Sequence, residues 1–321
     1  MRGRAEADVR TLLSRSFRYR AYLKTAPFAY RHKVVKAFRR SSIADRLWRE
    51  CTAEEIRTCT HDIYCDMMIR AYTGFTGLTV SPATGFAMTL FMIYIFTFDQ
   101  EFERLRHRPE SAEFEAVRGH RAVSDVWDGF VSYCQCLPNG AAVVALVEDR
   151  FRRYYQEFRR REEAASQLLD LPSTAALVDF DSGMVFETLH DILAIANQHE
   201  PTVSCRAQFR SVGLAGKFLD DLRDVGEDLR AGVPNLYHAA TECHPLERQR
   251  LTAAASENPR LSLAWLESHC PRSHDEYVKL TLEHYSSLET PAFRLPLDLN
   301  WALVGSRRYW DKPIRRAPEP V

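Results

Sequence analysis

The sequence predicts an all-α fold organised as a single helical bundle. Apolar residues recur at helical spacing along most of the chain, and helix start and stop signals accompany them. Few runs alternate apolar and polar residues as half-buried strands do. The chain has 321 residues, of which 45% are hydrophobic and 27% are charged. This is an ordinary globular composition, and the length is sufficient for one buried core.

The first two expected helices have the clearest start signals. Thr52 and Glu55 match a capping box, which satisfies unpaired amides at a helix start, so we expect a helix over about 52–71. Ser81 and Pro82 begin the next helix, over about 81–106, because proline is tolerated in a first turn. Its apolar run, 85–98, is too short to cross a bilayer and is expected to be buried. Pro- or Gly-bearing breaks separate the other expected helices, over about 110–134, 140–170, 173–197, 203–231, 245–256, 260–270, 273–288 and 297–310.

Charge distribution divides the chain into a basic arm, one helical domain and a short tail. The arm is expected over 1–45, because residues 1–40 contain twelve Arg or Lys residues against only Glu6 and Asp8. Aromatic residues between these charges favour an arm that docks on the core. The helical domain is expected over 46–312, and the Pro-rich tail 313–321 is expected to fray. The N-terminus lacks a secretory apolar run, so we expect a cytoplasmic protein.

The segment 213–237 contains a cluster of acidic residues beside an apolar helix face. Asp220, Asp224 and Asp228 are spaced i, i+4 and i+8, so their like charges lie within about two helical turns and repel one another. Divalent cations that prefer oxygen ligands, above all Mg²⁺, offset such repulsion. The alternative is a solvated helix in which Arg223 pairs with Glu227 one turn away.

A second pair of acids follows the apolar run. Asp99 and Glu103 are one turn apart and continue the helix face that carries Met92, Ile95 and Phe96. Two such helices facing each other would enclose a central apolar cavity with carboxylates at its mouth. Such a cavity suits a substrate that is hydrocarbon at one end and diphosphate at the other.

Three motifs in this order resemble those of the class I terpene synthases, or terpene cyclases, of the isoprenoid synthase superfamily. Residues 99–103 (DQEFE) resemble the aspartate-rich DDxx(D/E) motif, with Gln100 in place of the second Asp. Residues 220–228 (DDLRDVGED) resemble the second metal motif, (N/D)Dxx(S/T)xxxE. Residues 300–309 (NWALVGSRRY) are similar to the family's C-terminal helix that ends in an Arg-Tyr pair.

The resemblance implies specific roles for these residues. Metal ligands would be Asp99, Glu103, Asp220, Asp224 and Asp228, holding a cluster of three Mg²⁺ ions with the diphosphate. Diphosphate contacts would come from Arg308, Tyr309, Arg307, Asp221 and Arg223. The substrate pocket would include Met92, Ile95, Phe96 and Trp301. The implied reaction is ionisation of geranylgeranyl or farnesyl diphosphate followed by cyclisation to a terpene.

Other interpretations of the same residues stay open at this point. Residues 220–224 also resemble the second DDxxD motif of chain-elongating prenyl diphosphate synthases, and 223–232 resemble the RDVGEDxRxG segment of the head-to-head condensing squalene and phytoene synthases. A non-enzymatic alternative is a helical interaction protein whose basic arm binds a polyanion. A small-molecule diphosphate is the expected partner, nucleic acid and a membrane span are not expected, and a homodimer is an open possibility.

Overall fold

The computed structural model describes residues 60–297, apart from 106–113, 165–170, 234 and 295. The basic arm 1–45, the capping box at 52–55, the helix expected over 297–310 beyond residue 297 and the tail 313–321 therefore lie outside the described residues. Trp301, Arg307, Arg308 and Tyr309 also lie outside them.

Every regular element in the described part of the chain is a helix, which confirms the all-α prediction. The first elements are α4 (Thr60–Thr76), α5 (Pro82–Leu105), α6 (Phe114–Gly119), α7 (Arg121–Cys134) and α8 (Gly140–Ala164). A π-helical turn, η2 (Asp179–Gly183), joins α9 (Leu171–Val178) to α10 (Met184–Ala196). The last elements are α11 (Val203–Ala231), α12 (Leu236–Thr241), α13 (Pro245–Glu257), α14 (Leu263–His269) and α15 (Pro271–Ser286).

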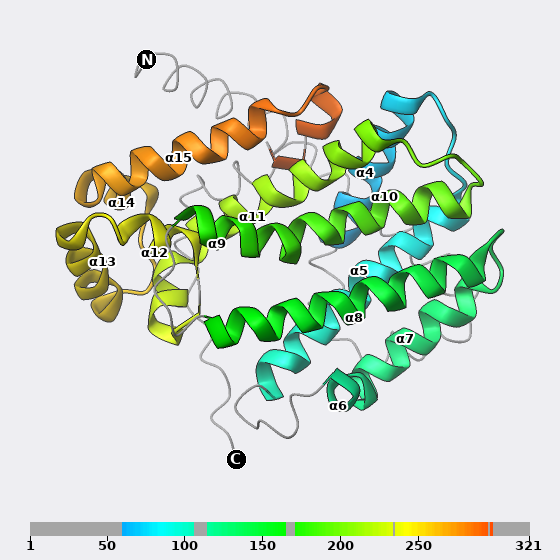
Figure 1. The fold of residues 1–321 in the computed structure, drawn as a ribbon, viewed down its shortest axis with the longest axis horizontal. Helices are drawn as coiled ribbons and strands as arrows, with labels where there is room; N and C mark the ends of the chain where they lie inside the picture. The colour runs from blue at the N-terminus through cyan, green and yellow to red at the C-terminus, as the bar shows by residue number, and fades with distance from the viewer. Residues whose placement is uncertain (1–59, 106–113, 165–170, 234, 295, 298–321) are drawn as a thin grey trace.

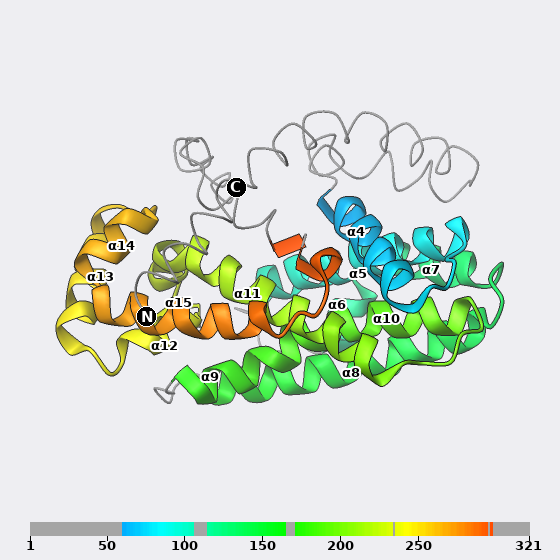
Figure 2. The ribbon, with the colours of Figure 1, turned by 90° about the horizontal axis from the view of Figure 1, so that it is seen from above.

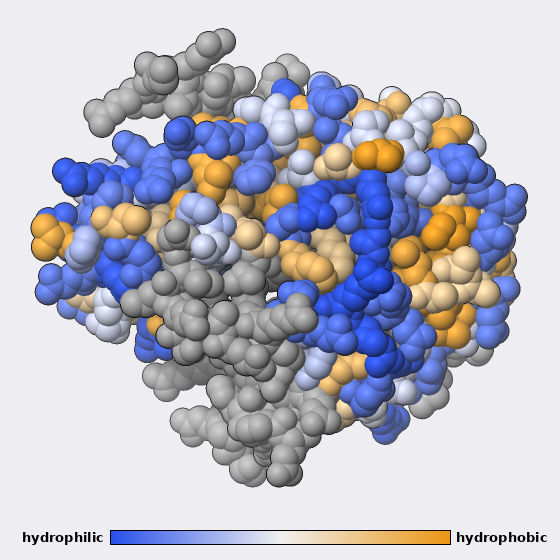
Figure 3. Space-filling model, viewed as in Figure 1, coloured by the Kyte–Doolittle hydropathy of each residue, from blue (hydrophilic) through white to orange (hydrophobic). Residues whose placement is uncertain are grey.

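The long helices run back and forth across the molecule, and the short helices α12, α13 and α14 gather at one end (Figure 1). Figure 2 shows α4 and α8 on opposite faces, with α5, α10 and α11 between them. Helix α10 packs against α5, α8 and α11, so it forms the centre of the bundle. Where Figure 3 shows the described residues, this face is largely hydrophilic, with smaller apolar areas between the hydrophilic ones.

Two apolar cores meet along α11. The larger core joins α4, α5, α7, α8, α10 and the first half of α11, and its aromatic centre includes Tyr94, Phe98 and Phe151. The smaller core joins the second half of α11 to α12, α13, α14 and α15. Because its apolar face is shared between the cores, α11 is held rigidly along most of its length.

Helix α5 confirms the expectation of a buried apolar helix, since Met88, Phe91 and Tyr94 are at most 2% exposed. The 18-residue stretch Pro82–Asp99 of this helix is longer than the apolar run 85–98. By length and composition alone, this stretch could cross a membrane. More than half of this stretch, 56%, is buried inside the bundle. Burial of that kind is typical of a core helix in a soluble protein, so the stretch is weak evidence for a span.

Three features of the helix pattern differ from the prediction. The helix expected over 110–134 is two helices, because His120 adopts an extended backbone between them. The helix expected over 173–197 is interrupted by the π-helical turn η2. Helix α12 was not expected, although Asn235, whose side chain accepts the Tyr237 amide, is a typical residue for beginning a helix.

Candidate functional site: the acidic segment of helix α11

The second half of α11 positions the acidic segment. Phe218, Leu222 and Val225 are at most 1% exposed in the smaller core, which confirms the apolar helix face expected beside the acidic residues. The helix ends at Gly232, whose left-handed backbone (φ 67°) terminates it. The Val233 amide then donates to the Asp228 carbonyl at 2.9 Å. This buried face and fixed end hold the carboxylates of the segment in a defined register.

Asp220 and Asp224 converge on one positively charged group. The Arg223 guanidinium donates from Nε to Asp224 Oδ1 at 2.7 Å, and its Nη2 contacts both Asp224 Oδ2 and Asp220 Oδ1. The side chains of Asp220, Arg223 and Asp224 are 44%, 30% and 28% exposed, respectively. Glu227, which the solvated-helix alternative pairs with Arg223, lies 3.3 Å from Arg260 Nε. The one guanidinium of Arg223 therefore pairs with both aspartates.

Asp221 has a different environment from its neighbours, because its side chain is only 1% exposed. Its Oδ2 accepts the Leu236 amide at 2.7 Å, and its Oδ1 lies 2.9 Å from Lys217 Nζ. Both carboxylate oxygens are thus engaged within the protein. In this structure Asp221 anchors the first turn of α12 on α11, rather than presenting an oxygen to a ligand.

Asp228 is held by Asn235, a residue that the sequence analysis did not select. The Asn235 amide donates to Asp228 Oδ2 and to the Asp221 carbonyl, both at 2.8 Å. Burial raises the pKa of Asp228 to about 6, the Asn235 hydrogen bond opposes this rise, and the nearby Asp221 and Asp224 charges add to it. A bound cation would lower this electrostatic cost.

The residues predicted on α5 differ in exposure, and the side chain of Glu103 lies outside the part of the chain that the structure describes. Met92 and Ile95 are 5% and 9% exposed and belong to the larger core, whereas Phe96 is 40% exposed. Asp99 is partly buried. Phe96 is therefore the predicted pocket residue on α5 that presents substantial surface.

Carboxylate oxygens of the α11 segment fit a hard cation by their chemistry, and Asp220 and Asp224 already share one cationic nitrogen. Among the described residues, however, no group of three or more His, Cys, Asp or Glu side chains is arranged to hold a metal ion. The contacts above give the physical reason. Arg223 lies between two of the carboxylates, Asp221 is turned toward α12, and Asp228 is turned toward Asn235.

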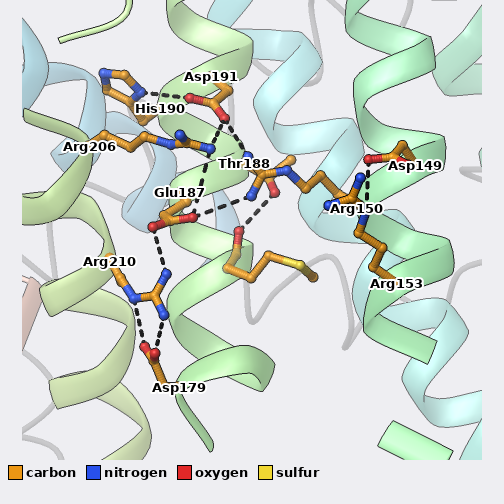
Figure 4. A network of polar contacts seen from close by, with 11 residues as sticks. Asp149, Arg150, Arg153, Asp179, Glu187, Thr188, His190, Asp191, Arg206 and Arg210 are labelled. Atoms are coloured by element: carbon orange, nitrogen blue, oxygen red, sulfur yellow. Dashed lines mark hydrogen bonds and ion pairs between the residues drawn. The ribbon is translucent and has the colours of Figure 1, made fainter. Parts of the chain in front are cut away.

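A network of alternating charges fixes the first half of α11 against its neighbours (Figure 4). Arg210 on α11 contacts Asp179 of η2 and Glu187 of α10. Asp191 of α10 accepts from Arg206 of α11 at 2.8 Å and from Arg150 of α8 at 3.1 Å. The buried His190 Nδ1 lies 3.0 Å from Asp191 Oδ1. Because each acid has arginine partners, the network is best explained as a brace that sets the position of α11.

Comparisons with known proteins support the architecture. No family model and no curated protein sequence matches the chain. A solved structure, the crystal structure of geranylgeranyl pyrophosphate synthase from Bacteroides thetaiotaomicron, is similar with a TM-score of 0.51 and 14% sequence identity. The similarity covers 80% of this chain and 92% of that one. The chain thus has an all-α fold of the isoprenoid synthase type.

Proposed function

We propose that this protein is an enzyme acting on isoprenoid diphosphates. The observation that carries the proposal is the convergence of Asp220 and Asp224 on one cationic nitrogen, on a helix whose apolar face is buried in a fold of the isoprenoid synthase type. Carboxylates beside a buried apolar helix face suit a substrate with a hydrocarbon chain and a charged diphosphate.

The specific reaction that we propose is ionisation of linear geranylgeranyl or farnesyl diphosphate and cyclisation of the carbocation, with release of diphosphate. Mg²⁺ at this site would supply positive charge that stabilises the diphosphate leaving group. The proposed ligands are Asp220, Asp224 and Asp228, together with Asp99 and Glu103. The proposed diphosphate donors are Arg223, Arg307, Arg308 and Tyr309.

The apolar side chains would act after ionisation. Aromatic faces stabilise cations, and exclusion of water prevents early quenching of a carbocation. Phe96, which is 40% exposed, and Trp301 are the proposed contacts for the hydrocarbon. Met92 and Ile95, which belong to the larger core, are the other proposed pocket residues.

Chain elongation is the second candidate, and the similar solved structure favours it because that protein is a geranylgeranyl pyrophosphate synthase. Head-to-head condensation is a further branch, supported by the segment 223–232. The cytoplasmic location, the homodimer and the polyanion-binding role of residues 1–45 stay predictions.

Product analysis tests the proposal. The purified chain is incubated with geranyl, farnesyl, geranylgeranyl and longer diphosphates, with and without Mg²⁺ and with and without isopentenyl diphosphate, and extracts are read by gas chromatography and mass spectrometry. Cyclic products that form with Mg²⁺ and do not require isopentenyl diphosphate support cyclisation. Longer diphosphates that need isopentenyl diphosphate support elongation. No turnover of any of these substrates contradicts the proposed enzyme.

Replacement of Asp224 tests the site itself. We expect Asp224→Asn to reduce turnover about 100-fold or more, as loss of one strong electrostatic contribution to a transition state does. Glu227→Gln is the matched control, since Glu227 lies three residues along the same helix and pairs with Arg260. Circular dichroism checks that both variants fold. Near wild-type turnover in folded Asp224→Asn would remove this residue from the mechanism.

A further inference from the structure

We propose that Arg223 is a built-in counter-cation for Asp220 and Asp224, and that a metal ion binds this pair only when the Arg223 guanidinium moves away. This inference rests on the proposed function, because it concerns metal binding at the same carboxylates. It adds a competition between a side chain and the metal, which would set the metal affinity of the free protein.

The contacts of Arg223 support this competition directly. Its guanidinium contacts both carboxylate oxygens of Asp224 and one oxygen of Asp220. A metal ion ligated by those oxygens would occupy the space that the guanidinium nitrogens fill. Since two positive groups at one place also repel each other, the metal and Arg223 compete for these oxygens.

The exposure of the three side chains makes the exchange feasible. Arg223 is 30% exposed, and its partners Asp220 and Asp224 are 44% and 28% exposed. Partly exposed ion pairs are weak because water screens both partners, and an arginine side chain has many alternative rotamers. Asp221 differs, because it is 1% exposed and is fixed by Lys217 and the Leu236 amide. The movable group is therefore Arg223, and the fixed group is Asp221.

A second ion pair on α11 provides a matched control. Arg260 Nε lies 3.3 Å from Glu227 Oε1, and Arg260 is 23% exposed. Arg260→Gln thus removes one arginine charge and breaks one pair with an acid of the same helix, while Asp220 and Asp224 keep Arg223. Any effect of net charge alone will appear in both variants.

The experiment measures binding of Mn²⁺ to the full chain by electron paramagnetic resonance and calorimetry, in the absence of any diphosphate. We expect Arg223→Gln to bind Mn²⁺ about fivefold more tightly than the unaltered protein, which is the upper end of the gain expected from releasing a partly exposed ion pair. Arg260→Gln should change the affinity less than about twofold, because a screened charge elsewhere has little effect. Equal effects of the two substitutions, or no effect of Arg223→Gln, would overturn the inference.

Two further variants separate the possible failures. Asp224→Asn in the Arg223→Gln background should abolish the added Mn²⁺ binding. If the double variant keeps that binding, the α11 carboxylates are not the metal site, and the proposed function fails at that point. If the double variant loses binding while Arg223→Gln alone equals the unaltered protein, only the counter-cation role fails. Arg223→Lys keeps the charge without the two-pronged contact, and we expect an intermediate affinity. It also replaces Arg223→Gln as the test if that variant does not fold.

Discussion

The raised pKa of Asp228 predicts an unusual pH dependence of stability. The pKa rises from 3.8 to about 6, mainly because the carboxylate is partly removed from water. A tenfold change in proton affinity corresponds to about 1.4 kcal/mol, so ionised Asp228 destabilises the folded state by about 2–3 kcal/mol at pH 7. Because the folded state binds this proton more tightly than the unfolded state, the group contributes to the free energy of unfolding below pH 3.8. This contribution is lost as the pH rises through about 6.

Asp228→Asn removes the titration while keeping a side chain that can accept the Asn235 hydrogen bond. We therefore expect the variant to gain stability relative to the unaltered protein as the pH rises, by about 2–3 kcal/mol between pH 4 and pH 7. Urea unfolding at four pH values, in buffers that contain a chelator, measures the difference. The comparison cancels the titration of groups that both proteins share.

Glu227→Gln serves as the control, because it removes an acid of the same helix that is 49% exposed and lies outside the Asn235 contact. A stability difference between Asp228→Asn and the unaltered protein that stays constant with pH would refute the reasoning. The burial of Asp228 and its acidic neighbours would then not control its proton affinity.

Two further predictions concern the packing of α11. Ala at Gly213 would place its Cβ 2.4 Å from the Ser182 carbonyl oxygen, so we expect Gly213→Ala to lower the free energy of unfolding by about 1–3 kcal/mol. Gly216→Ala, whose Cβ meets nothing nearer than 4.0 Å, should instead raise it by about 0.5–1 kcal/mol in the same urea titration; a loss at both sites would contradict the packing argument. Tyr277→Phe removes the 2.6 Å hydrogen bond to the Phe218 carbonyl, and we expect a cost of about 1–2 kcal/mol in thermal unfolding, whereas an unchanged melting temperature would show that this buried bond contributes nothing.

The sequence could predict the helices because their signals are local. The apolar stripe Phe218, Leu222 and Val225 repeats at helical spacing, and the structure buries all three residues. The apolar run of α5 is likewise buried. Breaks were harder to predict, since the π-helical turn η2 depends on close packing against α11, which no window of sequence reveals.

For the candidate site, the sequence determined which acids lie together on α11, because i and i+4 spacing fixes that proximity in any helix. Only the tertiary structure decided what each acid contacts. Asp221 faces the Leu236 amide and Asp228 faces Asn235, which belong to the segment that follows α11. Burial and partners from other segments set the charge and availability of a carboxylate, and these arise only when the chain folds back on itself.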